Sequence, residues 1–256
     1  MLVGPSLKYR TRWVEPRVLA IHAIDERGKK ARYEVGALDA AIVDADGVFE
    51  MLVGYLKMLG AHEATEIVIV ADGALWIWGR VADLIREAGL ERVRITQVID
   101  FYHATERIAA ISKLRASWPG NERERWVQRM VRQLRHAKVD TVLAECRALC
   151  RGRRSKEIRD LLDYFERNRD RMAYKQFKGR GLPIGSGVIE SAVRRVINLR
   201  VKGPGIIWHQ ENADKVLHMR VQLKLGQWER FIARSLGEMA PIRATAPISS
   251  GSQPAM

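Results

Sequence analysis

The sequence has few features of secreted or membrane proteins. It contains only two cysteines in 256 residues, Cys146 and Cys150, so a disulfide framework is excluded. No uninterrupted apolar run approaches the roughly 18 residues of a membrane-spanning helix, and the N-terminus lacks the charged and then apolar pattern of a signal peptide. Since 47% of the residues are hydrophobic and 29% are charged, we expect a folded, soluble protein of the cytoplasm with no membrane partner.

Acidic residues are fewer than basic ones, and most of this difference lies in one part of the chain. The chain has 44 Lys and Arg against 30 Asp and Glu, a net charge of +14. Residues 101–200 carry 24 of these cations against 11 acids, whereas residues 1–100 have a net charge of −2. This excess indicates either a solvated helical face or a nucleic-acid surface. We favour nucleic acid, because a polyanion would relieve the self-repulsion of so basic a region.

The first hundred residues alternate between strand and helix patterns. Branched apolar runs predict strands, and apolar residues at helical spacing that end at Gly60 or Gly89 predict helices. The expected order is a strand at 17–24, its hairpin partner at 31–36, a helix at 47–60, a strand at 66–73, a helix at 75–89 and a strand at 92–100. This order is typical of an α/β domain, in which ligands bind at the carboxyl ends of the strands.

The rest of the chain has helical patterns only. Charged, amphipathic segments fill 104–178, and three more helices are predicted at 188–201, 209–224 and 227–236. The tail from Pro241 is rich in Ser, Ala and Pro, which predicts disorder. We expect the two cysteines and the tryptophans Trp76 and Trp78 to face the core.

Two acids stand at positions where exposure would be unusual. Asp72 ends an apolar strand, and Glu190 lies in the first turns of a helix 118 residues later. Buried carboxylates need a neutralising cation, and Mg²⁺ prefers such hard oxygen ligands together with phosphate oxygens and water. The alternative for each acid alone is a structural role, because Asp-Gly is a common turn and Glu stabilises a helix start.

These acids belong to a series of motifs that together resemble one family. The chain is similar to the DDE transposases of bacterial insertion sequences, in the Kra-type group, and more distantly to Mutator-like and hAT elements. The matching stretches are WVEPRVL at 13–19, ADGALWIW at 71–78, DFYHATE at 100–106, LPIGSGVIESAVRRVINLRVKGPGIIW at 182–208 and ENADKVLHMR at 211–220.

The resemblance implies a ribonuclease H-like core interrupted by an all-helical insertion. It makes Asp72 the second acid and Glu190 the third acid of a catalytic triad that holds Mg²⁺ or Mn²⁺. Asp100 and His103 would form a supporting DxxH signature, although His103 is equally well explained as a structural histidine. The implied partners are the double-stranded DNA of element ends and target, and further copies of the chain on the nucleoid of a bacterium.

The chain departs from this family at its beginning. The family's first Asp lies on a strand upstream of the segment that reads WVEPR here, and no Asp precedes Asp25, which has the pattern of a turn. We therefore expect the first strand and first catalytic Asp to be missing and activity of this chain alone to be poor. The expected parts are a first core segment at 1–103, the insertion at 104–180, a second core segment at 181–238 and a disordered tail at 239–256. The alternatives are a non-catalytic DNA-binding remnant and a structure-specific nuclease of the same fold.

Basic residues close to Glu190 and in the insertion are the candidate DNA contacts. Arg194 lies one turn after Glu190, so it either holds a phosphate or forms an ion pair with that acid. Gly185 to Gly187 either let backbone amides approach a phosphate or form a turn and helix cap. Trp208 is the candidate for contacting a distorted base. The expected phosphate contacts are Arg194, Arg195, Arg200 and Lys202 near Glu190, and Arg151, Arg153, Arg154 and Lys156 in the insertion.

Overall fold

The computed structural model describes residues 13–25, 36–115, 117–152, 155–235 and 237, and its fold is mixed α/β. The first part has the predicted order of strands and helices. It consists of β1 (Arg17–Ile21), β2 (Ala37–Ala41), α1 (Ala45–Met58), a 3₁₀ turn (Ala61–Glu63), β3 (Glu66–Ala71), α2 (Leu75–Trp78), α3 (Val81–Ala88) and β4 (Arg94–Ile99).

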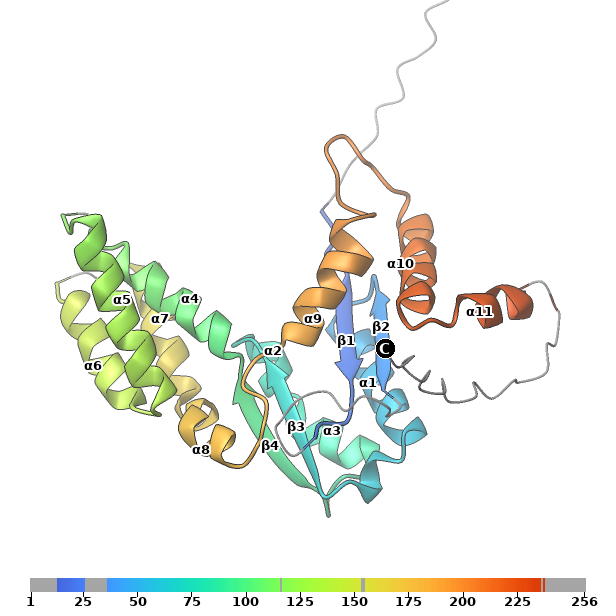
Figure 1. Cartoon of the computed structure of the whole chain (residues 1–256), viewed down its shortest axis with the longest axis horizontal. Helices are drawn as coiled ribbons and strands as arrows, with labels where there is room; N and C mark the ends of the chain where they lie inside the picture. Colours follow the sequence, from blue (N-terminus) through green and yellow to red (C-terminus); the bar gives the residue numbers. More distant parts are fainter. Residues whose placement is uncertain (1–12, 26–35, 116, 153–154, 236, 238–256) are drawn as a thin grey trace, which may run out of the picture.

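The strands form two separate pairs within the described residues. β1 pairs with β2 in antiparallel register, with Leu19 opposite Asp39, and β3 pairs with β4 in parallel register, with Ala71 opposite Ile99. Figure 1 draws the strands in the order β4, β3, β1, β2. The strands predicted at 66–73 and 92–100 are thus present, and they form the parallel pair.

One sequence prediction about this part was wrong, and another falls almost entirely outside the described residues. The hairpin partner of β1 is β2, whereas residues 26–35, which include almost all of the predicted partner, lie outside the described residues. β2 was missed because Asp39 interrupts its apolar pattern; the Asp39 carboxylate is accommodated by accepting a hydrogen bond from the Tyr55 hydroxyl at 2.6 Å. The single helix expected at 75–89 is two helices, broken at Gly79 and Arg80.

Helices account for the rest of the described chain. The first group is α4 (Phe101–Ser112), α5 (Gly120–Arg135), α6 (Val139–Leu149), α7 (Lys156–Arg167), a 3₁₀ turn (Arg169–Met172) and α8 (Tyr174–Gly179). It is followed by α9 (Gly187–Ala192), the π-helical segment η3 (Val193–Asn198), α10 (Gln210–Lys224) and α11 (Trp228–Ser235). None of the described helices is long and apolar enough to cross a bilayer.

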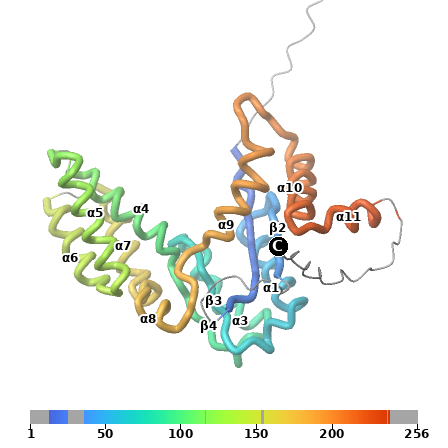
Figure 2. The backbone as a smooth tube through the Cα atoms, viewed as in Figure 1, coloured from blue at the N-terminus to red at the C-terminus, as the bar shows by residue number. Residues whose placement is uncertain are grey.

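The helices α4–α8 lie to one side of the strands, and α10 and α11 lie to the other (Figure 2). The core of the α4–α8 group is continuous with the sheet, because Val98 and Ile99 of β4 belong to the same buried cluster as Ile108 of α4 and Phe165 of α7. Cys146 and Cys150 are buried in this cluster and Trp78 packs there too, as the sequence predicted, whereas Trp76 is only half-buried and does not belong to it. Burial raises the pKa of the Cys146 thiol to about 12, with further contributions from Cys150 and Glu145.

A second link between the helical group and the sheet is polar. The Glu66 carboxylate of β3 accepts hydrogen bonds from the Thr96 hydroxyl and from the Arg180 guanidinium, each at 2.5 Å. Burial alone would raise the pKa of Glu66, but these two hydrogen bonds and the charges of Arg180 and Arg94 outweigh it, so the pKa is lowered. The chain that leaves α8 is thereby fixed against the start of β3.

Candidate nucleic-acid and metal site

The site is built where the parallel strands β3 and β4 end. The two strands run side by side up to Ala71 and Ile99, and the Asp100 amide donates to the Ala71 carbonyl at 2.8 Å. Asp72 and Asp100 therefore follow neighbouring strands at one edge of the sheet. This is the edge at which ligands bind in open α/β sheets.

Asp100 is the buried acid of this edge, with 0% of its surface exposed. Its Oδ1 accepts from the backbone amides of Tyr102 at 2.7 Å and His103 at 3.1 Å, which caps the N-terminus of α4. Its Oδ2 accepts from the Ser186 amide at 2.5 Å and also from the Ser186 hydroxyl. Both carboxylate oxygens are thus occupied by protein donors, which gives Asp100 a structural role at the junction.

The Asp100–Ser186 contact brings the start of α9 to the edge of the sheet. Ser186 precedes α9 directly, and Glu190 lies one helical turn further on. A Cβ on Gly185 would lie 2.9 Å from the Tyr102 ring, so a glycine is needed for this close approach. The 185–187 segment is therefore the turn that the sequence offered as one alternative, and its serine binds an aspartate of the core.

Asp72 and Glu190 are both exposed, and the expectation of buried carboxylates was wrong for both. Asp72 comes one residue after β3 and turns back so that its Oδ1 accepts from the Ala74 amide at 2.9 Å, as in an Asp-Gly turn. β3 itself is only half-buried along its whole length. Exposure removes the argument that a cation must neutralise these acids, but it leaves their oxygens open to a ligand in solvent.

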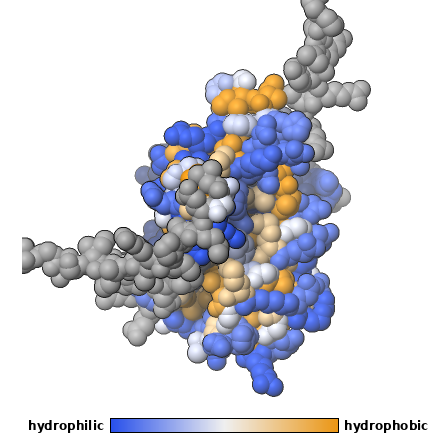
Figure 3. Space-filling view, turned by 90° about the vertical axis from the view of Figure 1, so that its right-hand side faces the viewer, coloured by the Kyte–Doolittle hydropathy of each residue, from blue (hydrophilic) through white to orange (hydrophobic). Residues whose placement is uncertain are grey.

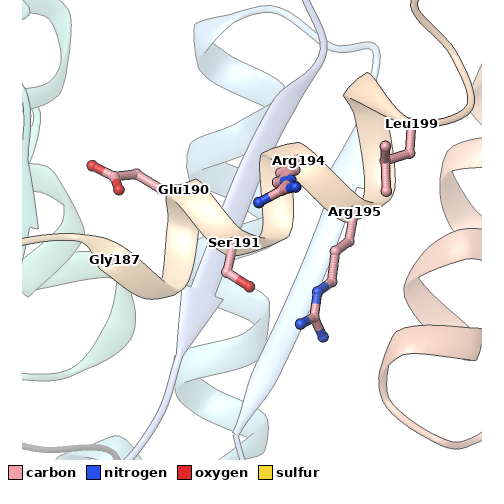
Figure 4. A pocket seen from close by; sticks show the side chains of 6 residues that line it. All are labelled: Gly187, Glu190, Ser191, Arg194, Arg195 and Leu199. Atoms are coloured by element: carbon pink, nitrogen blue, oxygen red, sulfur yellow. The ribbon is translucent and has the colours of Figure 1, made fainter.

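A pocket of about 510 Å³ lies along the helical segment that contains Glu190, as shown in Figure 4. Its walls come from one face of α9 and η3, because Ala192, Val196 and Ile197 on the other face are buried against β2 and α10. The pocket is lined by Gly187, Glu190, Ser191, Arg194, Arg195 and Leu199.

The two arginines of this pocket are exposed. They lie in η3, a π-helical segment, and such segments are rare and frequent at functional sites. Arg220 of α10 donates to the Arg195 carbonyl at 2.9 Å and so holds this turn in place. In Figure 4 the Glu190 carboxylate and the Arg195 guanidinium point in different directions. No ion pair joins Glu190 to Arg194 among the described residues, so the simple surface pair considered from the sequence is not formed.

Tyr164 of α7 is a neighbour of Asp72 that sequence patterns did not reveal. Its ring is 5% exposed and covers Gly73 so closely that a Cβ there would lie 2.0 Å from the ring. Its hydroxyl is buried and finds no hydrogen-bond partner in the described part of the chain. Burial raises the pKa of Tyr164, the Arg107 charge lowers it, and the charges of Asp72 and Asp100 raise it further. The only sequence signal was the glycine after Asp72.

The remaining residues that the sequence predicted as supporting or DNA-binding lie at separate places in the fold. The Nδ1 of His103 lies 3.4 Å from the Glu106 carboxylate on the surface of α4, so its side chain has a local partner within its own helix. Arg151 and Lys156 are exposed at the ends of α6 and α7, whereas Arg153 and Arg154 lie outside the described residues. Arg200 and Lys202 are exposed immediately after η3.

In the described ranges, no group of three or more His, Cys, Asp or Glu side chains is placed to hold a metal ion. Asp72 and Glu190 are two carboxylates, one fewer than the triad that the resemblance implied. Comparison of the chain with protein-family models, curated proteins and solved structures finds no match. A functional assignment therefore depends on the chemistry of these residues themselves.

Proposed function

We propose that this chain is part of a DDE transposase of a bacterial insertion sequence, which binds duplex DNA and takes part in metal-dependent strand cleavage and transfer. The observation that supports this most directly is the hydrogen bonding of Ser186 to Asp100. It fixes the start of α9, the helix that carries Glu190, against the end of β4, and β4 ends beside β3, which Asp72 follows directly. The arginines of the 510 Å³ pocket begin one turn after Glu190 and suit the phosphates of a DNA backbone.

Asp72 and Glu190 would hold the Mg²⁺ or Mn²⁺ of such a site. Carboxylate oxygens are the ligands that these ions prefer, and the ions commonly complete their coordination with water and substrate phosphate. When bound, the metal would activate the attacking oxygen and stabilise the leaving one. The chain's own contribution is to present the two carboxylates and to position the phosphate with Arg194 and Arg195.

The separation of the two strand pairs supports the proposal that a catalytic strand is missing between them in the part of the chain that the structure describes. A two-stranded sheet is marginally stable on its own, yet β3 carries an apolar run that is only half-buried. Ile21 of β1 and Ile67 of β3 pack on the same apolar cluster around Leu56 and Leu84, so both inner strands rest on one helical layer. A strand between them would complete a ribonuclease H-like sheet and bring the first acid of the triad.

DNA binding is the first test of this proposal. Fluorescence anisotropy with a labelled duplex over a series of KCl concentrations should give an affinity that falls steeply with salt. Replacing Arg194 and Arg195 together by Ala should reduce the slope of log affinity against log salt by about 0.9 for each phosphate that the protein no longer neutralises. The matched control is Arg86→Ala, an exposed arginine of α3 that pairs with Asp83 at 2.7 Å and should leave the slope unchanged. An affinity that does not respond to salt would contradict the proposal.

A cleavage assay separates the transposase from the alternative of a non-catalytic DNA-binding remnant. Since Asp72 and Glu190 are the two carboxylates proposed as metal ligands among the described residues, we expect weak or absent activity of this chain alone. The assay measures cleavage at the element ends of supercoiled donor DNA with Mg²⁺ or with Mn²⁺. Cleavage that appears when the chain is produced with an added upstream strand carrying an Asp, and that is lost with Asp72→Asn or Glu190→Gln, would support a catalytic core. Specific end cleavage that persists in both variants would contradict the assignment of these acids.

A further inference from the structure

The loop between η3 and α10 carries exposed apolar side chains that no part of the described fold covers. Ile206 is 49% and Ile207 70% exposed, and the neighbouring Leu199 is 54% exposed. Figure 3 shows apolar atoms at the upper end of the molecule, at the height where Figure 1 draws this loop. Scattered exposed apolar residues are ordinary, but a cluster of large ones at a protruding tip indicates a contact with a partner.

Two hydrogen bonds and two glycines fix the conformation of this loop. The Trp208 indole N–H donates to the Val201 carbonyl at 3.0 Å and closes the loop at its base. The Ile206 amide donates to the Gly203 carbonyl at 3.2 Å, and a Cβ on Gly203 would lie 2.6 Å from the Ile206 side chain. Gly205 has a φ of +72°, which favours glycine. Trp208, the sequence candidate for base contact, therefore braces the loop, and Ile207 is the side chain that it presents.

The charge around this tip indicates what kind of partner it meets. Residues 191–210 contain four cations, Arg194, Arg195, Arg200 and Lys202, and no acid. Leu199 lines the same pocket as Arg194 and Arg195, so an exposed apolar side chain lies beside the first two of these cations. A partner that is uniformly anionic and also offers apolar surface between its charges fits this arrangement. Duplex DNA has both properties, since its phosphates surround stacked bases.

We propose that Ile206 and Ile207 insert between base pairs of bound duplex DNA, while the flanking cations contact the phosphates. Apolar side chains act as such wedges in several DNA-bending proteins, where they unstack a base step and kink the duplex. This inference rests on the proposed function in one respect only, namely that the chain binds DNA. It assigns the two isoleucines a part in deforming the DNA, which the acidic edge of the sheet does not provide.

The test replaces both isoleucines by Ser and measures affinity over a salt series, as for the arginines. The affinity should fall about tenfold or more, because apolar burial against the bases is removed, while the salt slope stays unchanged because every phosphate remains neutralised. Arg200→Ala with Lys202→Ala should show the opposite pattern, with a slope lower by about 0.9 for each phosphate released. Met58→Ser, at an equally exposed apolar residue of α1, is the control and should change neither quantity.

A spectroscopic measurement then shows insertion directly. A duplex containing 2-aminopurine should become more fluorescent on binding the wild-type chain, as its bases unstack, and end-labelled duplexes should show a bend by energy transfer. Both signals should be lost in the Ile206→Ser, Ile207→Ser variant, whose thermal unfolding should match the wild type since both side chains are exposed.

Wild-type affinity in this variant, or bound DNA that is neither unstacked nor bent, would overturn the inference while leaving DNA binding intact. A loss of affinity that sedimentation traces to dissociation of a protein dimer would also overturn it and would make the loop a protein contact. If the wild-type chain binds no DNA, the proposed function and this inference both fail.

Discussion

The hydrogen bonds between Asp100 and Ser186 should carry a measurable part of the stability, and a double-mutant cycle tests this. Ser186→Ala removes one hydrogen bond to a buried carboxylate, which should cost about 1.5–2 kcal/mol of the free energy of unfolding. Asp100→Ala removes the acceptor of four donors, including the two amides that it caps in α4. Its cost should be larger, about 3–5 kcal/mol, from a lost cap of about 1 kcal/mol plus unpaired buried donors.

The cycle is measured by urea unfolding, followed by tryptophan fluorescence. The double variant should lose about 1.5 kcal/mol less free energy of unfolding than the sum of the two single variants. The reason is that the hydrogen bond from the Ser186 hydroxyl to Asp100 is removed in each single variant but can be lost only once in the double variant. Ser186→Ala alone should lower the melting temperature by about 3–8 °C for a chain of this size. Hydrogen exchange should also show faster opening of α9, which this contact holds against the sheet.

Ser155→Ala provides the matched control for the cycle. The Ser155 hydroxyl oxygen accepts from the Ile158 amide at 3.3 Å and caps α7, so its loss should cost about 1 kcal/mol and add independently to Asp100→Ala. If Ser186→Ala costs nothing, or if its effect adds fully to that of Asp100→Ala, the reasoning that this pair joins α9 to the sheet is refuted.

Three further predictions concern the surroundings of the site. Gly73→Ala should cost about 1–3 kcal/mol in urea unfolding, because the new Cβ would meet the Tyr164 ring, while Tyr164→Phe should keep the stability of the wild type; a harmless Gly73→Ala would contradict this packing. Because the pKa of Glu66 is lowered in the folded state, its carboxylate stabilises the fold above the unfolded-state pKa of about 4.3, and this contribution is lost as the pH falls through the folded-state pKa. Glu66→Gln should therefore be less stable than the wild type at pH 7 but not at pH 2, and an equal difference at both pH values would exclude the linkage. Cys146 should resist iodoacetamide at pH 8 until the protein is unfolded, as mass spectrometry of its peptide would show, because burial keeps its pKa near 12; rapid labelling in native buffer would contradict this.

Most of the elements were predictable from the sequence because their patterns are local. The apolar run that became β3 and the helical pattern at 209–224 that became α10 correspond to elements at nearly the predicted bounds. β2 was missed because Asp39 looks unsuitable for a strand until Tyr55 is seen to donate to it. The pairing of strands into two separate sheets also depends on contacts between distant segments, which no local pattern encodes.

The candidate site could be predicted in its residues but not in their burial. The sequence predicted that Asp72 follows a strand and that a second strand ends at Asp100, and the structure shows that these two strands, β3 and β4, end together. Which of the two is buried depends on Ser186, 86 residues after Asp100, and only the fold shows that contact. Tyr164 was missed for the same reason, because the side chain that covers Gly73 comes from a helix far along the chain.

The proposal that Asp72 and Glu190 share one site at the end of the parallel strands is tested most directly by cross-linking. Both exposed acids are replaced by Cys, the buried native cysteines remain in place, and the folded protein is treated with a short bifunctional thiol reagent. We expect an intramolecular cross-link between positions 72 and 190 in high yield, and none in the control with Asp72→Cys and Glu229→Cys on α11. If both engineered thiols react singly but are never joined, the two acids do not share a site.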